Sequence, residues 1–308
     1  MTHEPIPHWP GELVRMGDQQ VYVRSTPDKT GEPALCVHGL AGSSRNWTDL
    51  IDLLRPRLAC DALDLPGFGD SPPRPDRRYS IAALAQTVAA LIESREHKVH
   101  LIASSLGGAV AVKVAAARPD LVRTLTLISP ALPDPRPHLD QVHFAVLSLP
   151  GVGPRLLRKY DALPPRNRVA DVITTCFSDP ARFPAERFAT EVAELARRDT
   201  LDHATAALIG TIRTLTADFF RKGRHTGWRD AARITAPTLI IYGSDDRVVD
   251  PRLAGRAAHA FANSRIVVLP RTGHLAHMEH PEQVAAEITI MLDATAQRAR
   301  EFPLAPAG

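Results

Sequence analysis

The chain has 308 residues, of which 44% are hydrophobic and 23% charged, a composition typical of a folded globular protein with a sizeable core. Its 37 basic and 34 acidic residues leave a formal net charge of only +3, and the basic residues are scattered, so nucleic acid is not expected as a partner. The three cysteines form no close pair, the first residues lack a signal-peptide pattern, and no apolar run is long enough for a membrane span. We therefore expect a soluble, cytoplasmic protein, whose oligomeric state the sequence does not predict.

Short β-rich runs alternate with helical patterns along the chain, which is typical of a mostly parallel central sheet with flanking helices. Several of the runs are continuously apolar, as strands buried on both faces require. We predict strands at Gln20–Ser25, Ala34–His38, Ala59–Asp64, Val99–Ala103, Thr124–Ser129, Thr238–Tyr242 and Arg265–Leu269. We predict helices at Ser80–Ser94, Ser105–Ala117, Arg252–Ala262 and Pro281–Ala294. The expected fold class is α/β.

One long segment interrupts this alternation, since residues 131–235 contain no convincing strand pattern. Apolar residues there recur at helical spacing: Leu208, Ile212, Leu215 and Phe219, and again Phe188, Val192 and Leu195. A structureless loop of this length is uncommon in a compact domain. We therefore predict a core made of residues 1–130 and 236–308, with a helical cap, residues 131–235, inserted over one end of the sheet.

The segment from Val99 to Ala117 has the pattern of an apolar strand, a tight turn and a helix rich in small residues. Ser105 lies at the turn, and its flanking residues Ala103 and Gly107 match the nucleophile elbow G-x-S-x-G except that Ala replaces the first Gly. The strained turn needs small residues on both sides because neighbouring backbone approaches closely, and Ala is the least disruptive replacement. An ordinary Ser in a plain turn is the alternative, but the strand–turn–helix context favours a nucleophile.

A Gly-rich run, HGLAGSSRNW, directly follows the predicted strand Ala34–His38. Such a turn can present the backbone N–H of Leu40 to a developing oxyanion, together with the N–H of Leu106 after the elbow. A plain glycine turn is the alternative. His38 itself is better interpreted as a structural, hydrogen-bonded histidine.

A carboxylate pair follows the strand that ends at Gly243. Asp245 and Asp246 lie at the carboxyl edge of the predicted sheet, where the active sites of open α/β folds gather. One of the two could hold an imidazole in the right tautomer, while the other would be a solvated turn or capping residue. The residues alone do not separate these roles.

The third loop of interest follows the last predicted strand and carries His274, which could reach Ser105. His277 and His280 are its rivals, but they more simply belong to the start of the final helix. Three histidines might suggest a metal site, yet the sequence has no second cluster of ligands. We expect neither a metal nor an organic cofactor.

These motifs, in the order Ser…Asp…His, resemble the α/β-hydrolase superfamily, as does the loop DLPGFGDS at Asp64–Ser71. The resemblance extends from about Leu13 to Met291. It implies a triad of Ser105, Asp246 and His274, because the family's acid lies three residues after the strand-ending glycine. It also implies hydrolysis of a small-molecule carboxylic ester through an acyl-enzyme, without a cofactor.

Other activities on the same fold stay open. Haloalkane dehalogenases and epoxide hydrolases use an Asp nucleophile, so Ser105 argues against both. Meta-cleavage C–C hydrolases usually carry Asn before the nucleophile and Trp after the catalytic His, where this chain has Ser104 and Leu275. Cofactor-free perhydrolases and non-catalytic ligand-binding proteins are further alternatives. A membrane-surface lipase has weak support, because the helices of a folded cap are expected to bury their apolar faces.

Overall fold

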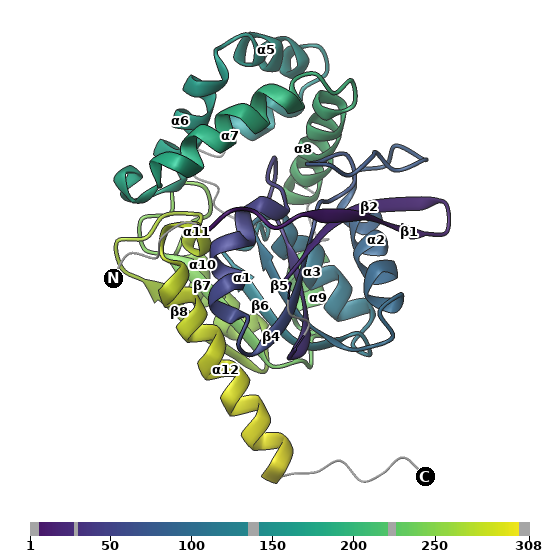
Figure 1. Cartoon of the computed structure of the whole chain (residues 1–308), viewed down its shortest axis with the longest axis vertical. Coiled ribbons are helices and arrows are strands. Elements are labelled where there is room, and N and C mark those ends of the chain that lie inside the picture. Colours follow the sequence, from purple (N-terminus) through teal and green to yellow (C-terminus); the bar gives the residue numbers. More distant parts are fainter. Residues whose placement is uncertain (1–5, 28–29, 135–141, 221–225, 302–308) are drawn as a thin grey trace.

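The chain forms one eight-stranded sheet within the residues that the computed structural model describes, 6–27, 30–134, 142–220 and 226–301 (Figure 1). The strand order is β1-β2-β4-β3-β5-β6-β7-β8. The strands are β1 (Gly11–Met16), β2 (Gln19–Ser25), β3 (Glu32–Val37), β4 (Leu58–Leu63), β5 (Val99–Ser104), β6 (Val122–Ile128), β7 (Thr238–Gly243) and β8 (Ser264–Leu269). Strand β2 is antiparallel to β1 and β4, and the other neighbours pair in parallel. The predicted mostly parallel α/β sheet is confirmed.

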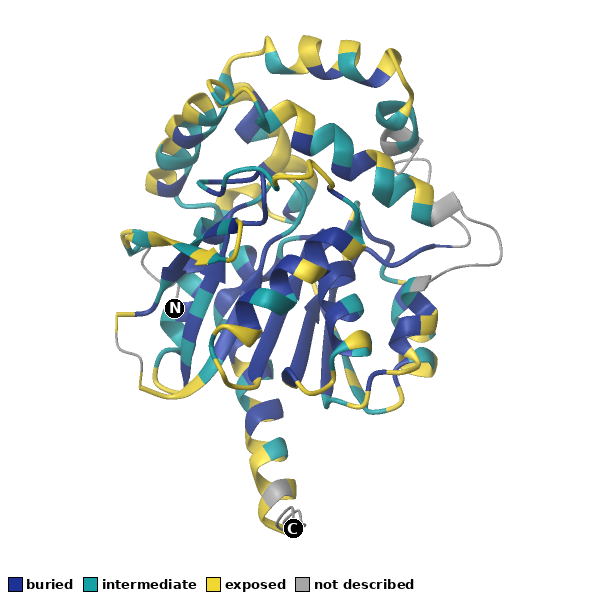
Figure 2. Cartoon of the chain, turned by 90° about the vertical axis from the view of Figure 1, so that its right-hand side faces the viewer, coloured by how far each residue is buried: buried dark blue, intermediate teal, exposed yellow. Residues whose placement is uncertain are grey.

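The central strands are buried along their whole length (Figure 2). Every position of β5, VHLIAS, and of β7, TLIIYG, is buried, as their apolar sequences predict for strands covered on both faces. All seven predicted strands are present, with ends shifted by two residues or fewer. The edge strand β1 was not predicted. None of its positions is buried, so its sequence, GELVRM, carries no strong apolar signal.

Helices cover both faces of the sheet. On one face pack α2 (Ile81–Glu93), α3 (Leu106–Ala117), α9 (Thr226–Ala231) and α10 (Leu253–Ala260). On the other face pack α1 (Thr48–Leu54) and α12 (Pro281–Glu301), together with the short η1 (Ser44–Trp47) and α11 (Ala276–Glu279). The predicted helices correspond to α2, α3, α10 and α12. Helix α12 continues to Glu301, past the predicted end at Ala294, and α1 and α11 were not predicted.

The segment between β6 and β7 is helical where it is described. It contains α4 (Val142–Ser148), α5 (Val152–Asp161), α6 (Pro165–Cys176), η3 (Pro180–Arg182), α7 (Ala185–Arg198), α8 (Ala204–Phe220) and α9. Helices α5, α6 and α7 lie beyond one end of the sheet (Figure 1). Helix α9 differs, since it packs against the core helices α3 and α10, whereas α8 packs mainly against α4 of the insertion. We therefore propose that the cap, when it is defined by its packing contacts, ends with α8 and does not include α9.

Two of the cap helices bury the apolar faces that their sequences predict. On α8, Ile212 is buried and Leu208 packs against the core, whereas the side chain of Phe219 lies outside the described residues. On α7, Phe188 and Val192 pack against a cluster around Ile173. The expectation is wrong for α5, which leaves large apolar side chains exposed. None of the described helices is long and apolar enough to cross a membrane.

Candidate active site

Ser105 connects β5 to α3 in a strained backbone conformation. Its φ of 52° and ψ of −118° lie in a region that residues with a side chain rarely adopt. Two backbone hydrogen bonds hold the turn: the Ser105 N–H donates to Ile128 O at 3.0 Å, and Ser105 O accepts from the Ala131 N–H at 2.9 Å. The surroundings therefore fix a sharp turn at the carboxyl end of a central strand.

Close backbone contacts explain the small residues around this turn. A Cβ atom at Gly107 would lie 2.3 Å from Val37 O and 2.5 Å from His38 O, so any side chain there would collide with the end of β3. A Cβ atom at Gly39 would lie 3.0 Å from the Cβ of Ser105. The loop after β3 thus packs directly against Ser105.

Asp246 lies in the loop after β7 and forms a buried pair with His274. Its Oδ2 lies 2.9 Å from His274 Nδ1, and its Oδ1 accepts hydrogen bonds from the N–H groups of Val248 and Val249 at 2.8 and 2.9 Å. Burial alone would raise the pKa of Asp246, but the neighbouring His274 and the Val249 N–H outweigh it and lower that pKa. Asp246 is therefore an ionised hydrogen-bond acceptor at neutral pH.

The structure separates Asp246 from Asp245, which the sequence pattern could not do. Asp245 points to the surface, where its carboxylate accepts hydrogen bonds from the hydroxyls of Ser178 and Ser244 at 2.5 and 2.7 Å. These two bonds lower the pKa of Asp245. Only Asp246 contacts a histidine, as the superfamily resemblance implies.

His274 is almost fully buried, and its partner fixes its tautomer. Because an ionised carboxylate only accepts hydrogen bonds, Nδ1 of His274 must carry the proton donated to Asp246, which leaves Nε2 free to accept one. Among the described residues no hydrogen bond joins His274 to the Ser105 hydroxyl. Such bonds are often long in enzymes without bound substrate.

The two rival histidines have other contacts. His277 lies in α11 and stacks on Trp47 with ring centroids 4.4 Å apart. His280 directly precedes α12, and its Nε2 lies 3.2 Å from Arg271 O. Within the described part of the chain, no three His, Cys, Asp or Glu side chains gather as metal ligands would. The three histidines at 274, 277 and 280 therefore do not converge.

The two predicted oxyanion donors belong to segments next to Ser105: Leu106 follows it directly, and Leu40 follows Gly39, which packs against it. Leu106 is the first residue of α3, where backbone N–H groups have no acceptor within the helix. The Leu40 N–H has no hydrogen-bond acceptor among the described residues. His38 holds this loop from below: its Nδ1 lies 2.7 Å from Gly39 O, and its Nε2 accepts from the Leu65 N–H at 2.9 Å. Burial lowers the pKa of His38, as suits the structural histidine that we expected.

Glu279, which the sequence analysis did not single out, supports the histidine loop. This buried carboxylate accepts a hydrogen bond from the N–H of Gly273, directly before His274, at 2.6 Å. It also accepts from the N–H of Asp179, at the end of the α6 segment, at 2.8 Å. Asp179 is a hundred residues away along the chain, so no local sequence signal could have found this link between the histidine loop and the insertion.

A second group of residues that the sequence analysis missed joins α7 to the Leu40 loop. The Arg198 Nη1 donates to Ala41 O at 2.9 Å, and its Nε lies 3.6 Å from the buried Glu194. Ala41 has a φ of 58°, so this contact holds a peptide in a left-handed turn. Glu194 also pairs with Arg197 at 2.8 Å. The helical insertion thus reaches the same loop that packs against Ser105.

Residues 33–281 match a family model described as the alpha/beta hydrolase fold. The match covers well over half of the chain, and the protein belongs to the α/β-hydrolase family.

Its relatives include proteins with different named activities. The dihydrolipoyllysine-residue acetyltransferase component of the acetoin cleaving system of Pseudomonas putida is 29% identical over 85% of this chain, which spans only 64% of that relative's length. The pimeloyl-[acyl-carrier protein] methyl ester esterase of Neisseria meningitidis is 26% identical, with coverage of 85% and 93%. The solved 2-hydroxy-6-oxo-6-phenylhexa-2,4-dienoate hydrolase of Rhodococcus shares the fold, with a TM-score of 0.73, 18% identity and coverage of 92% and 100%. The family and the relative named as an esterase support a hydrolytic enzyme.

Proposed function

We propose that this protein is a serine hydrolase that cleaves a small-molecule carboxylic ester through an acyl-enzyme intermediate. One observation carries the proposal: His274 is held by the buried Asp246 in the tautomer that leaves Nε2 free, on the same sheet edge as the strained Ser105. The relative named as a methyl ester esterase adds support for an ester as substrate. An acyl-enzyme needs no metal or organic cofactor.

The proposed reaction has two steps. In the first, His274 Nε2 takes the proton of the Ser105 hydroxyl while Oγ forms a bond to the ester carbonyl carbon. The imidazolium then gives this proton to the leaving alkoxide as the ester C–O bond breaks. In the second step, water loses a proton to Nε2 and attacks the acyl-enzyme, and the proton returns to Ser105 as the acid leaves.

The charges of the site suit this sequence of proton transfers. Asp246 stays ionised, so it stabilises the imidazolium that forms on His274 in each step. We assign the oxyanion hole to the N–H groups of Leu40 and Leu106, which belong to segments next to Ser105. Removing one such donor typically costs about 10²- to 10³-fold in rate.

Hydrolysis of p-nitrophenyl esters from acetate to octanoate tests the proposal. We expect turnover by the wild type that falls about 10⁴-fold or more in Ser105→Ala. Ser104→Ala is a matched control, because this neighbouring serine is buried and its Oγ has no hydrogen-bond partner among the described residues. It should leave the rate nearly unchanged.

The same assay separates the alternatives. If no ester is cleaved but a fluorophosphonate still labels Ser105, the triad is competent and a C–C bond becomes the first candidate for cleavage. If neither turnover nor labelling occurs, the protein is a binding protein on a hydrolase fold, and the proposal is wrong.

A further inference from the structure

Helix α5 carries an apolar stripe that faces solvent. Val152, Leu156 and Tyr160 recur at a spacing of four residues on one face of this helix, and Leu149 and Leu163 lie in the turns just before and just after it. They are 37–49% exposed: Leu149, Val152, Leu156, Tyr160 and Leu163. We call these five residues the α5 stripe. The same helix buries the neighbouring face, since Gly153 and Leu157, about 100° round the helix from Val152 and Leu156, are buried.

This exposure is concentrated rather than scattered over the molecule. The described residues include nine exposed large hydrophobic side chains, and six of them lie between Leu149 and Val172. Single exposed hydrophobic residues are ordinary, whereas a contiguous set on one helix marks an interaction surface. Neighbouring α6 and α7 pack part of their apolar faces against each other around Ile173, although Val172 of α6 is also exposed.

Basic residues accompany the stripe and have no acidic partners. Arg155, Arg158 and Lys159 are exposed on α5, and no ion pair of the described residues includes any of them. Their hydrogen bonds are to backbone carbonyls of their own helix turn, from Arg155 to Gly151 O and from Arg158 to Pro154 O. Some other arginines of the insertion are neutralised, as Arg168 is by two aspartates. The charges on α5 are therefore available to an anionic surface.

The stripe also lies where a flat surface could reach it. Helix α5 forms the outer tip of the helical insertion, at the end of the molecule opposite to α12 (Figures 1 and 2). An apolar helix face flanked by arginine and lysine is the pattern of helices that lie in the plane of a lipid interface. Anionic headgroups attract such basic side chains.

We propose that the α5 stripe docks this protein onto an anionic lipid surface, with its apolar side chains in the headgroup–acyl boundary and its basic residues on lipid phosphates. A second copy of the chain fits less well, because a two-fold contact through α5 would bring like charges together. An acidic protein would pair with the basic residues of α5, but its acidic surface would not cover the apolar stripe along its length. The proposal does not depend on ester hydrolysis by Ser105.

Sedimentation of the full chain with lipid vesicles tests the proposal. We expect binding to phosphatidylcholine vesicles that contain phosphatidylglycerol, weaker binding as salt rises, and little binding to pure phosphatidylcholine. Leu156→Ser and the double variant Arg155→Glu/Arg158→Glu should each reduce the partition coefficient by about tenfold or more. Ile290→Ser, an equally exposed residue on α12, is the matched control and should bind as the wild type does.

The contrary outcomes are distinct. Wild-type protein that stays in the supernatant with anionic vesicles overturns the proposal, as does unchanged binding by the α5 variants. Sedimentation equilibrium without lipid identifies the other occupant: a dimer that Leu156→Ser dissociates would assign the stripe to a second copy of the chain. Circular dichroism confirms that each variant is folded.

Discussion

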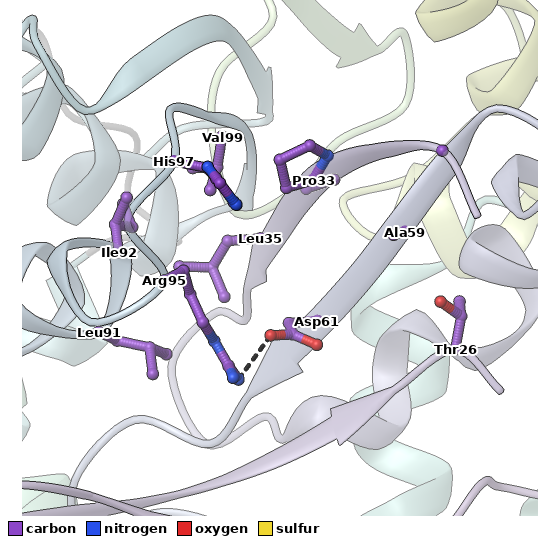
Figure 3. A pocket seen from close by; sticks show the side chains of 12 residues that line it. Thr26, Pro33, Leu35, Ala59, Asp61, Leu91, Ile92, Arg95, His97 and Val99 are labelled. Atoms are coloured by element: carbon purple, nitrogen blue, oxygen red, sulfur yellow. Dashed lines mark ion pairs between the residues drawn. The ribbon is translucent and has the colours of Figure 1, made fainter. Parts of the chain in front are cut away.

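The two ends of the parallel strands carry polar residues in opposite circumstances. At the carboxyl ends, Ser105 has a strained backbone, and Asp246 and His274 are buried together. At the amino ends, Arg95 and Asp61 form an ion pair of 2.6 Å beside a hollow, with side chains 29% and 18% exposed (Figure 3). Strain and buried charge persist only where the surrounding structure enforces them. We therefore infer that catalysis takes place at the carboxyl ends of the strands, whereas the amino ends hold an ordinary ion pair.

The hollow at the amino ends shows why shape alone is a poor guide to the active site. It is lined largely by apolar residues of β3 and α2, such as Leu35 and Leu91 (Figure 3). Its charged groups neutralise each other, because Asp61 forms the ion pair with Arg95. Asp61 also accepts a hydrogen bond from Ser25 at 2.6 Å. A concave surface whose charges are paired in this way offers no activated group to a substrate.

The largest contrast is expected between the two adjacent aspartates. Asp246→Asn should lower kcat by about 10²- to 10⁴-fold, because the amide cannot stabilise the imidazolium and favours the wrong tautomer. Asp245→Asn should change kcat by less than about twofold, since the Asp245 carboxylate lies at the surface and, among the described residues, accepts hydrogen bonds only from two serine hydroxyls. Ester hydrolysis by both variants measures this. A larger loss in Asp245→Asn would mean that the acid is wrongly assigned.

A smaller effect is expected from Arg198, which we regard as a positioning residue for the Leu40 loop. Arg198→Ala should lower kcat by about tenfold with little change in KM, because the loop loses the hydrogen bond to Ala41 O. Arg198→Lys should recover part of the rate. Arg197→Ala is the matched control, since Arg197 pairs with Glu194 but not with Ala41. Equal losses in both arginine variants would show a general effect of α7 instead.

The buried His277 should make stability depend on pH. Burial, with a further contribution from His274, lowers the pKa of His277 to about 3 from an ordinary value of 6.5. Between these values the unfolded chain binds a proton that the folded chain does not, so stability falls as the pH drops from 6.5 towards 3. His277→Phe keeps a ring on Trp47 and should reduce this pH dependence by up to about one proton. Urea unfolding between pH 7 and 4 measures the slope, and an unchanged slope would contradict the assignment.

The smallest effect is expected at the amino ends of the strands. Arg95→Ala should leave kcat and KM within about twofold of the wild type, because its ion pair lies at the opposite end of the sheet from Ser105. Stability should fall by only about 0–1 kcal/mol, as for other partly exposed ion pairs. Ester hydrolysis and urea unfolding test both statements. A large loss of activity would contradict the claim that the amino ends of the strands take no part in catalysis.

Local sequence patterns predicted the elements that are determined locally. Continuous apolar runs identified β5 and β7, and the small residues around Ser105 identified the turn. The edge strand β1 was missed because no position in it is buried, and α5 was not recognised as exposed because exposure depends on what packs against a helix.

The site was predictable to the extent that single motifs define it. Ser105 and His274 stand in recognisable loops, whereas the choice between Asp245 and Asp246 needed the superfamily resemblance; in the structure, Asp246 is the one of the two that contacts a histidine. The contacts of Glu279 with Asp179 and of Arg198 with Ala41 join residues that are a hundred or more positions apart in the chain. Such contacts leave no local signal in one sequence.

The most direct test of the account is to trap the covalent intermediate. Wild-type protein is mixed with p-nitrophenyl acetate, quenched with acid within the first turnover, digested, and the peptides analysed by mass spectrometry. We expect one added acetyl group on the peptide that contains Ser105. This acetyl group should be absent in Ser105→Ala and present in Ser104→Ala. Turnover of the ester with the acetyl group on another residue, or with no reduction in Ser105→Ala, would contradict the assignment of Ser105 as nucleophile.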